Sequence, residues 1–254
     1  TTAMVFKLEP PEVITPVLPA AVREAVPLKP ELALQVDDQV LRFIDALAAE
    51  DVHSDAFKAR LDSGVVGTLE SLQITSNDPS PPPPSYVAVS GGLYKDMAIH
   101  DFDMARWLLG EEPIEVYAAG SCLVDPEIGR LGDIDTARTV LKTASGRLCV
   151  IANSRRSGFG YDQRIEAYAS AGMVRADNVL ESTVQTWGEG GAASDRFQNF
   201  FLARYAEAYR GEMDHFADML DGAAASVGYA DGVAALALAE AAARSVASGQ
   251  PVAP

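Results

Sequence analysis

Residues 90–118 read SGGLYKDMAIHDFDMARWLLGEEPIEVYA, and this stretch decides the fold. Its apolar spacing predicts a helix from about Lys95 to Leu109. Gly110 and Pro113 end that helix, because glycine tolerates the left-handed turn after a last helical residue and proline cannot continue a helix. Strand-like sequence begins directly afterwards, so the helix leads into a β-rich region.

Strand-like segments separated by glycine-containing turns make up most of this region, as in an antiparallel meander. The predicted strands are VVGTLESLQIT (65–75), IEVYAAGSCLV (114–124), IDTARTVLKT (134–143), RLCVIANS (147–154), QRIEAYAS (163–170) and MVRADN (173–178). Further helical spacing is found at residues 18–26, 36–49, 54–63, 197–222 and 227–249. This order predicts an α+β fold, a mostly antiparallel open sheet with helices on one face. The proline-rich run at 77–86 predicts an extended surface loop, with a partner-binding motif as the alternative.

The composition is that of a folded, acidic protein. The 254 residues include 36 acidic and 20 basic ones, a formal net charge of −16, and 48% are hydrophobic. This hydrophobic share supports the core of one large or two modest domains and excludes overall disorder. The acidic excess argues against a nucleic-acid partner, and no apolar run approaches the roughly 20 residues that cross a bilayer. Cys122 and Cys149 lack the spacing of a metal or redox site, so we expect free thiols in a reducing cytoplasm.

A carboxylate and an imidazole on the predicted helix are the candidate catalytic groups. Asp96 and His100 stand four residues apart, so a helix places them on one face, which Asp103 continues. A carboxylate near an imidazole can fix its tautomer and let it act as a base toward an alcohol. A surface pair or a buried structural histidine would show the same spacing. A metal bound by these three residues would lack a second histidine, so we expect no metal site.

The same stretch resembles the substrate-domain helix of the glucose–fructose oxidoreductase, inositol dehydrogenase and rhizopine catabolism (Gfo/Idh/MocA) family, and within it the inositol 2-dehydrogenases. The resemblance continues through FGYDQRIEAYASAGMVRADN (159–178) and RYAEAYRGEMDHFADMLDG (204–222) and covers about residues 55–252. It implies a two-domain, NAD-dependent oxidoreductase. In such enzymes the Asp and His of a D-x-x-x-H motif, matched here by Asp96 and His100, surround the alcohol carbon together with a lysine. The His takes the hydroxyl proton while hydride leaves to the nicotinamide.

The amino end departs from the family pattern. Of the family's Glu-Lys-Pro motif only Lys29 and Pro30 are present, which makes Lys29 a catalytic candidate and both residues cofactor contacts; an unrelated surface lysine is the alternative. No glycine precedes Gly64, so the glycine-rich turn that holds a dinucleotide pyrophosphate is missing. We therefore expect residues 1–52 to be a remnant of a Rossmann domain and residues 53–254 to be the substrate-binding and oligomerisation domain. A natural truncation, a decayed paralogue and a sequence with omitted stretches all fit this pattern.

The resemblance also suggests substrate contacts and an assembly. Tyr161, on a turn into a strand, could offer its hydroxyl to a polyol. Asn153 and Arg155 end a strand whose open face could meet substrate or another subunit. Tyr209 is a further substrate candidate on the apolar stripe of a helix, where a packed tyrosine is the alternative. The open sheet implies a homo-oligomer, a dimer or a tetramer.

Three functions remain open from the sequence. The first is an inositol 2-dehydrogenase-like oxidoreductase that oxidises a cyclitol or sugar hydroxyl to a ketone with NAD and with His100 as base. The second is a catalytically silent domain that binds a polyol or assembles with a complete dehydrogenase. A metal-dependent hydrolase built on Asp96, His100 and Asp103 is the third and has the least support.

Overall fold

The structure is a computed structural model, and it describes residues 52–254. Lys29, Pro30 and the helices predicted at 18–26 and 36–49 lie outside the described residues. Among the described helices, none combines the length and the hydrophobicity that a membrane span requires.

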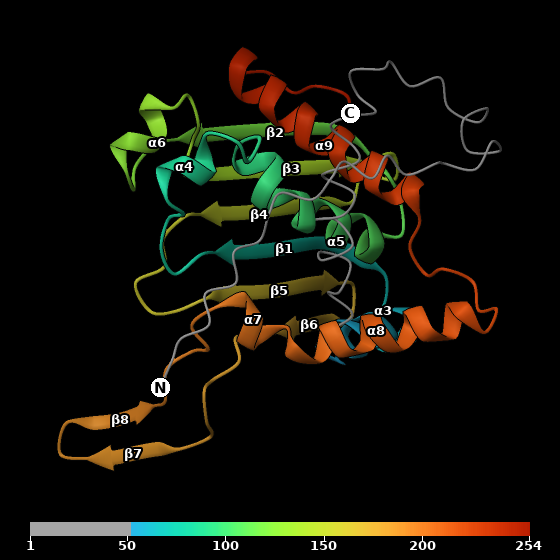
Figure 1. Ribbon diagram of the computed structural model, residues 1–254. Coiled ribbons are helices and arrows are strands. Elements are labelled where there is room, and N and C mark those ends of the chain that lie inside the picture. The colour runs from blue at the N-terminus through green and yellow to red at the C-terminus, as the bar shows by residue number, and fades with distance from the viewer. Residues whose placement is uncertain (1–51) are drawn as a thin grey trace. The chain divides into compact units, whose positions relative to one another are not determined.

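A six-stranded sheet has the spatial order β2-β3-β4-β1-β5-β6 (Figure 1). Every neighbouring pair is antiparallel except β1 and β4, which run parallel. The strands are β1 (Leu69–Asn77), β2 (Pro113–Ser121), β3 (Thr136–Thr143), β4 (Leu148–Ser154), β5 (Asp162–Ala169) and β6 (Gly172–Ala176). The predicted α+β fold with a mostly antiparallel sheet is confirmed, and all six predicted strands are present.

The predicted meander is only partly right. β2, β3 and β4 are consecutive antiparallel neighbours, but β1 lies between β4 and β5. In the middle of the sheet Ile74 of β1 stands opposite Ile151 of β4 and Ile165 of β5. Because parallel strands end at the same edge of a sheet, Asn77 at the end of β1 lies beside Ser154 at the end of β4.

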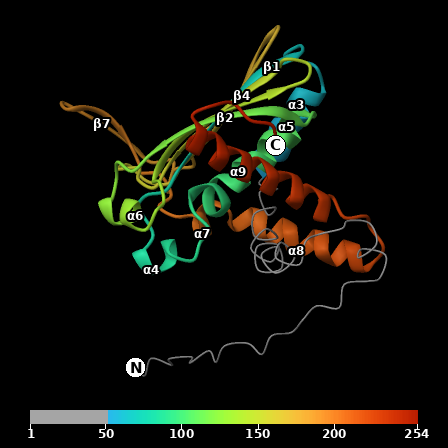
Figure 2. The ribbon, with the colours of Figure 1, turned by 90° about the horizontal axis from the view of Figure 1, so that it is seen from above.

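Helices cover one face of this sheet (Figure 2). α9 (Tyr229–Ser248) packs on β2 and on α5 (Ile99–Leu109), and α5 also contacts β1. α3 (Val52–Asp62) contacts β6, and two short helices, α4 (Pro84–Val87) and α6 (Pro126–Arg130), contact each other. On the other face, side chains such as Tyr117 and Val150 are exposed, as the predicted one-sided arrangement requires.

The helix predicted from Lys95 to Leu109 is present and begins with an irregular turn. Tyr94–Ala98 is a π-helical turn, from which α5 continues to Leu109. Such turns are rare and are frequent at functional sites. Gly110, with φ 62°, ends the helix and donates its N–H to the carbonyl of Arg106.

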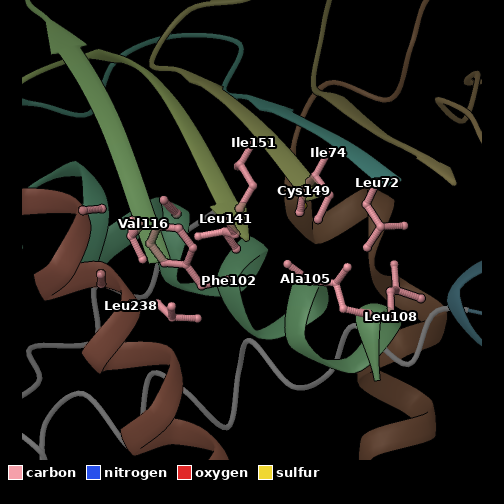
Figure 3. Close-up of a cluster of buried hydrophobic side chains, with 14 of the residues drawn as sticks. Leu72, Ile74, Phe102, Ala105, Leu108, Val116, Leu141, Cys149, Ile151 and Leu238 are labelled. Carbon is pink, nitrogen blue, oxygen red and sulfur yellow. The ribbon is translucent and has the colours of Figure 1, made fainter. Parts of the chain in front are cut away.

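The hydrophobic core lies between α5, α9 and the inner face of the sheet (Figure 3). Phe102 of α5 is fully buried and stacks on Tyr94 with ring centroids 6.4 Å apart. The side chains that meet α5 there include Leu72, Ile74, Val116, Leu141, Cys149, Ile151 and Leu238. Each large apolar side chain buried in this way contributes roughly 1.5–3 kcal/mol. The core therefore holds α5, and with it the π turn, firmly against the sheet.

The helix predicted over residues 197–222 is broken. Its parts are α7 (Phe201–Arg204) and α8 (Ala206–Leu220), because Tyr205 leaves helical geometry at φ −107° and ψ 20°.

A hairpin of β7 (Gln185–Gly188) and β8 (Gly191–Ser194) was not predicted. All of its residues are exposed. The alternation that marks a half-buried strand is therefore absent from its sequence.

Candidate active site

The parallel strands bring two charged residues together at one edge of the sheet. Asp78 follows β1 and Arg155 follows β4, and the Asp78 N–H donates to the carbonyl of Ser154 at 2.9 Å. The side chains approach one another too, with Arg155 Nη1 3.6 Å from Asp78 Oδ2. Proteins with open α/β sheets commonly bind ligands outside the carboxyl ends of their parallel strands. We therefore expect a ligand site at the carboxyl ends of β1 and β4.

Asp96 is held at the same edge from two sides. Arg155 Nη2 donates to Asp96 Oδ2 at 2.6 Å, and the Tyr86 hydroxyl donates to Asp96 Oδ1 at 2.5 Å. The side chains of Arg155 and Asp96 are only 4% and 10% exposed. Charge-assisted hydrogen bonds are the strong ones, so the orientation of this carboxylate is well determined.

The proline-rich run predicted as a surface loop positions Tyr86. The backbone remains extended at Pro83, with φ −64° and ψ 149°, and α4 begins at Pro84. Proline suits a first helical position, where its missing N–H would have had no helical partner. One turn of helix then carries Tyr86 to Asp96, so the run has a structural role at the site.

His100 lies one turn beyond Asp96, in the first turn of α5, and its side chain is exposed. Asp96 itself belongs to the π turn Tyr94–Ala98 and is mostly covered. The helix predicted to carry both residues thus presents an anchored carboxylate followed by an accessible imidazole. Their catalytic roles stay predictions.

Asn153 is placed differently from the prediction of an open sheet face. It is completely buried, and its Nδ2 donates to Asp101 Oδ2 at 2.7 Å. Burial raises the pKa of Asp101 to about 7, although the hydrogen bond from Asn153 lowers it. Asn153 therefore orients a buried carboxyl group behind the site, and a direct contact with substrate stays a prediction.

Two carboxyl groups of this cluster, those of Asp78 and Asp101, have raised pKa values. Burial raises the pKa of Asp78 to about 6; the Arg155 guanidinium opposes this and the Asp96 carboxylate adds to it. The charge of Asp78 in turn helps to raise the pKa of Asp101. Carboxyl groups whose pKa values are shifted toward neutral pH by burial and by neighbouring charges are typical of acid–base sites.

Tyr161 approaches this cluster from the turn before β5. Burial raises the pKa of its phenol well above the usual value, and Tyr205 and Asp78 add to the effect. Its ring packs edge-on against Tyr205, with centroids 6.0 Å apart and planes at 89°. Tyr209 follows Tyr205 by one turn, is half-buried, and donates its N–H to the Tyr205 carbonyl at 3.0 Å. Substrate binding by Tyr161 and Tyr209 stays a prediction.

The sequence did not point to Asp78, Tyr86 or Asp101. Asp78 follows a predicted strand, which is a recognised position for functional polar residues, but only the pairing of β1 with β4 shows its partner. Tyr86 lies in a run that the sequence predicts as a loop. Asp101 is buried, whereas the polar face predicted for its helix consists of Asp96, His100 and Asp103.

The metal alternative on Asp96, His100 and Asp103 has no support from the geometry. Asp103 Oδ1 lies 2.9 Å from Arg106 Nη1 in an ion pair. In the part of the chain that the structure describes, no three His, Cys, Asp or Glu side chains gather as metal ligands would.

Comparison with known proteins agrees with this fold. Residues 55–175 match the family model of the GFO/IDH/MocA C-terminal domain. An inositol 2-dehydrogenase of Rhizobium meliloti is 46% identical over 198 residues, which are 78% of this chain and 60% of that protein. A myo-inositol 2-dehydrogenase of Thermotoga maritima is 50% identical over 190 residues, 74% of this chain and 57% of that protein. An inositol 2-dehydrogenase 4 of Saccharopolyspora erythraea is 30% identical over 251 residues, 87% of this chain and 70% of that protein.

Solved structures show the same architecture. A myo-inositol dehydrogenase from Corynebacterium glutamicum matches with a TM-score of 0.76 and 41% identity, over 79% of this chain and 60% of that one. A scyllo-inositol dehydrogenase from Lactobacillus casei, solved with bound NAD(H) and scyllo-inositol, matches with a TM-score of 0.75 and 25% identity, over 82% of this chain and 63% of that one.

Fold and site together define an α+β domain with a polar cluster at the carboxyl ends of its two parallel strands. The chain belongs to the Gfo/Idh/MocA family. It spans 60% and 57% of the lengths of the first two relatives.

Proposed function

We propose that this chain is an inositol 2-dehydrogenase-like oxidoreductase, which oxidises a hydroxyl group of a cyclitol or sugar to a ketone with NAD. The observation that carries the proposal is the anchored Asp96 one turn before the exposed His100. The names of the relatives, inositol 2-dehydrogenase and myo-inositol 2-dehydrogenase, support a polyol substrate.

The described side chains account for the substrate half of such a reaction. His100 takes the hydroxyl proton as the carbon loses hydride, so that the alcohol gives up two electrons and becomes a ketone. Asp96, held by Arg155 and Tyr86, provides an oriented carboxylate next to the reacting hydroxyl. The phenol of Tyr161 stays protonated and offers a hydrogen bond to a further hydroxyl of the polyol.

The cofactor half of the reaction requires residues beyond those described. When bound, NAD supplies the hydride acceptor. The proposed contacts Lys29 and Pro30, and Lys29 as a third catalytic residue, rest on the family resemblance alone. The NAD(H)-bound scyllo-inositol dehydrogenase supports NAD for this chain.

We further propose a homo-oligomer, a dimer or a tetramer that buries the open face of the sheet. Apolar side chains line up over three strands of that face, with Tyr117 of β2 opposite Val140 of β3 and Val140 opposite Val150 of β4. Tyr168 and Met173 form another outward pair between β5 and β6, and both are exposed. Registered rows of aromatic and aliphatic side chains are suited to a self-complementary interface.

We propose a cytoplasmic location. Cys122 and Cys149 are both free thiols, and Cys149 is fully buried. Unpaired cysteines are the rule in reducing compartments, which supports this assignment.

The function is tested by calorimetry on the 254-residue chain, with NAD titrated first and myo-inositol then added to the same cell. We expect NAD to bind and NADH absorbance to rise after the polyol is added. His100→Gln should lower kcat at least about 100-fold, because the base is lost. His215→Gln is the matched control and should keep wild-type turnover, since His215 lies on α8 and contacts Ser226.

The outcome against the proposal is a folded chain that gives no heat with NAD and no NADH with any cyclitol. That result would favour the silent domain that binds a polyol or assembles with a complete dehydrogenase. Equal turnover in the two histidine variants would instead refute His100 as the base.

A further inference from the structure

Arg155 is the point at which the charged groups of the site meet. Its Nη2 donates to Asp96 at 2.6 Å, and its Nη1 lies 3.6 Å from Asp78. Its backbone N–H donates to the carbonyl of Asp135 at 2.8 Å, which fixes the start of the segment that follows β4. One nearly buried guanidinium is thus shared by two carboxylates from different elements.

The Arg155 guanidinium binds Asp96 more closely than Asp78, and this difference indicates its role. The short hydrogen bond goes to Asp96, whereas the contact with Asp78 is longer than a normal hydrogen bond. Arg155 Nε is buried and has no hydrogen-bond partner among the described residues. The guanidinium is therefore oriented so that Nη2 binds Asp96 while its Nε–H is left without an acceptor. Buried polar atoms are nearly always satisfied, and an exception at a site calls for a functional reason.

We propose that Arg155 is a positioning residue: it holds the Asp96 carboxylate in place for the substrate, while Asp78 competes for the same guanidinium. The inference rests on the proposed function, because it assumes that Asp96 contacts the reacting polyol. Arg155 acts only through Asp96 and need not touch the substrate itself.

The surroundings of Asp78 make the competition measurable. It is faced by Arg155 from the end of β4, by Asp96 from the π turn, by Asp101 from α5 and by Tyr161 from the turn before β5. Because burial raises the pKa of Asp78 to about 6, its titration lies in an accessible range and reports the balance of charge around it.

The kinetic test compares Arg155→Gln with Arg155→Lys in the full chain. We expect Arg155→Gln to lower kcat about 100-fold with little change in KM, since a misplaced reacting group costs turnover more than ground-state binding. Arg155→Lys should recover about tenfold of that loss, because an ammonium restores the charge but not the two-point geometry. Arg156→Gln is the matched control: it removes the same charge from the neighbouring, exposed residue and should leave kcat within about twofold.

A second readout does not depend on turnover. Carboxyl ¹³C NMR of aspartate-labelled protein, with Asp78→Asn used for assignment, gives the titration midpoint of Asp78. We expect Arg155→Gln to raise that midpoint by about one unit or more, because an opposite charge is lost. Asp96→Asn should lower it, because a like charge is lost and the guanidinium becomes available to Asp78. Arg156→Gln should not move it.

The two readouts separate the possible failures. If the wild-type chain shows no turnover, the proposed function fails, and the NMR midpoints still decide whether Arg155 couples Asp78 to Asp96. Unmoved midpoints in both Arg155→Gln and Asp96→Asn would overturn the coupling. If Arg155→Gln only lowers the folded fraction, with kcat per folded molecule unchanged, Arg155 is a structural residue and the proposal is wrong.

Discussion

At the scale of single residues, we expect the buried carboxyl group of Asp101 to make folding stability depend on pH. Its carboxyl group is buried between α5 and the sheet, where it accepts a hydrogen bond from Asn153. Burial raises its pKa to about 7, against a value of 3.8 for an unperturbed aspartate. The folded chain therefore keeps a proton that the unfolded chain releases between these two values. Folding stability should fall as pH rises through that window and level off above pH 7.

Asp101→Asn removes this titration. We expect the variant to be more stable than the wild type at pH 8 by about 2 kcal/mol, because the buried site no longer has to hold a charge. The Oδ1 atom of Asn153, buried and without a partner among the described residues, is available to accept from the new amide after a side-chain flip. Urea unfolding at pH 5 and pH 8 measures the effect.

A matched control is Asp214→Asn on the exposed side of α8, which should leave stability unchanged at both values of pH. The pH dependence should become shallower in Asp101→Asn without vanishing. Burial also raises the pKa values of Asp78 and Asp103 to about 6, so these residues act in the same direction. A variant with the same slope as the wild type would show that Asp101 does not titrate as described.

The candidate site could be predicted from sequence only where its residues share one element. Asp96 and His100 stand four residues apart, and helical geometry alone suffices to place them one turn apart on the same face. Asp78 and Arg155 are far apart along the chain, and their contact depends on two strands pairing out of sequence order. Periodicity within a segment carries no information about such a pairing.

At the scale of elements, the end of α5 is set by Gly110. Its φ of 62° lies in the left-handed region, and a Cβ placed there would meet no atom within 4 Å. Gly110→Ala should therefore lower the free energy of unfolding by about 1 kcal/mol, through backbone strain without steric overlap. Thermal or urea unfolding measures the change.

Gly158→Ala is the control for that substitution. Gly158 also has open space around its Cβ position but does not adopt the left-handed conformation. Alanine should there be neutral or stabilising, because it reduces the conformational freedom of the unfolded chain. Equal losses in the two variants would mean that the helix end does not depend on the glycine conformation.

Elements with a marked period were predictable, and elements without one were not. The alternation in β2, β3 and β4 and the apolar stripe of α5 follow directly from which face is buried. The hairpin of β7 and β8 buries neither face, so its sequence shows no such pattern. The break at Tyr205 interrupts a continuous helical pattern, and only the packing of its ring against Tyr161 marks the position.

At the scale of the whole molecule, the described helices leave one face of the six-stranded sheet uncovered (Figure 2). Its exposed side chains include Tyr117 at 43% and Val150 at 38%. Contiguous exposed apolar surface on a sheet is commonly an interaction site. The proposed oligomer follows from this surface and is independent of catalysis.

Val150→Glu tests that assembly, because the change places a charge in the middle of the face, next to Val140 of β3. We expect the Val150→Glu variant to form smaller species than the wild type at micromolar concentration, since burying an unpaired carboxylate in an interface costs several kcal/mol. Light scattering coupled to size exclusion measures the mass. Val65→Glu adds the same charge at a valine that is 70% exposed in the turn before β1, away from the row on the open face, and should keep the wild-type mass. A wild-type chain that is already a monomer would refute the oligomer, and a Val150→Glu variant of unchanged mass would place the interface on another surface.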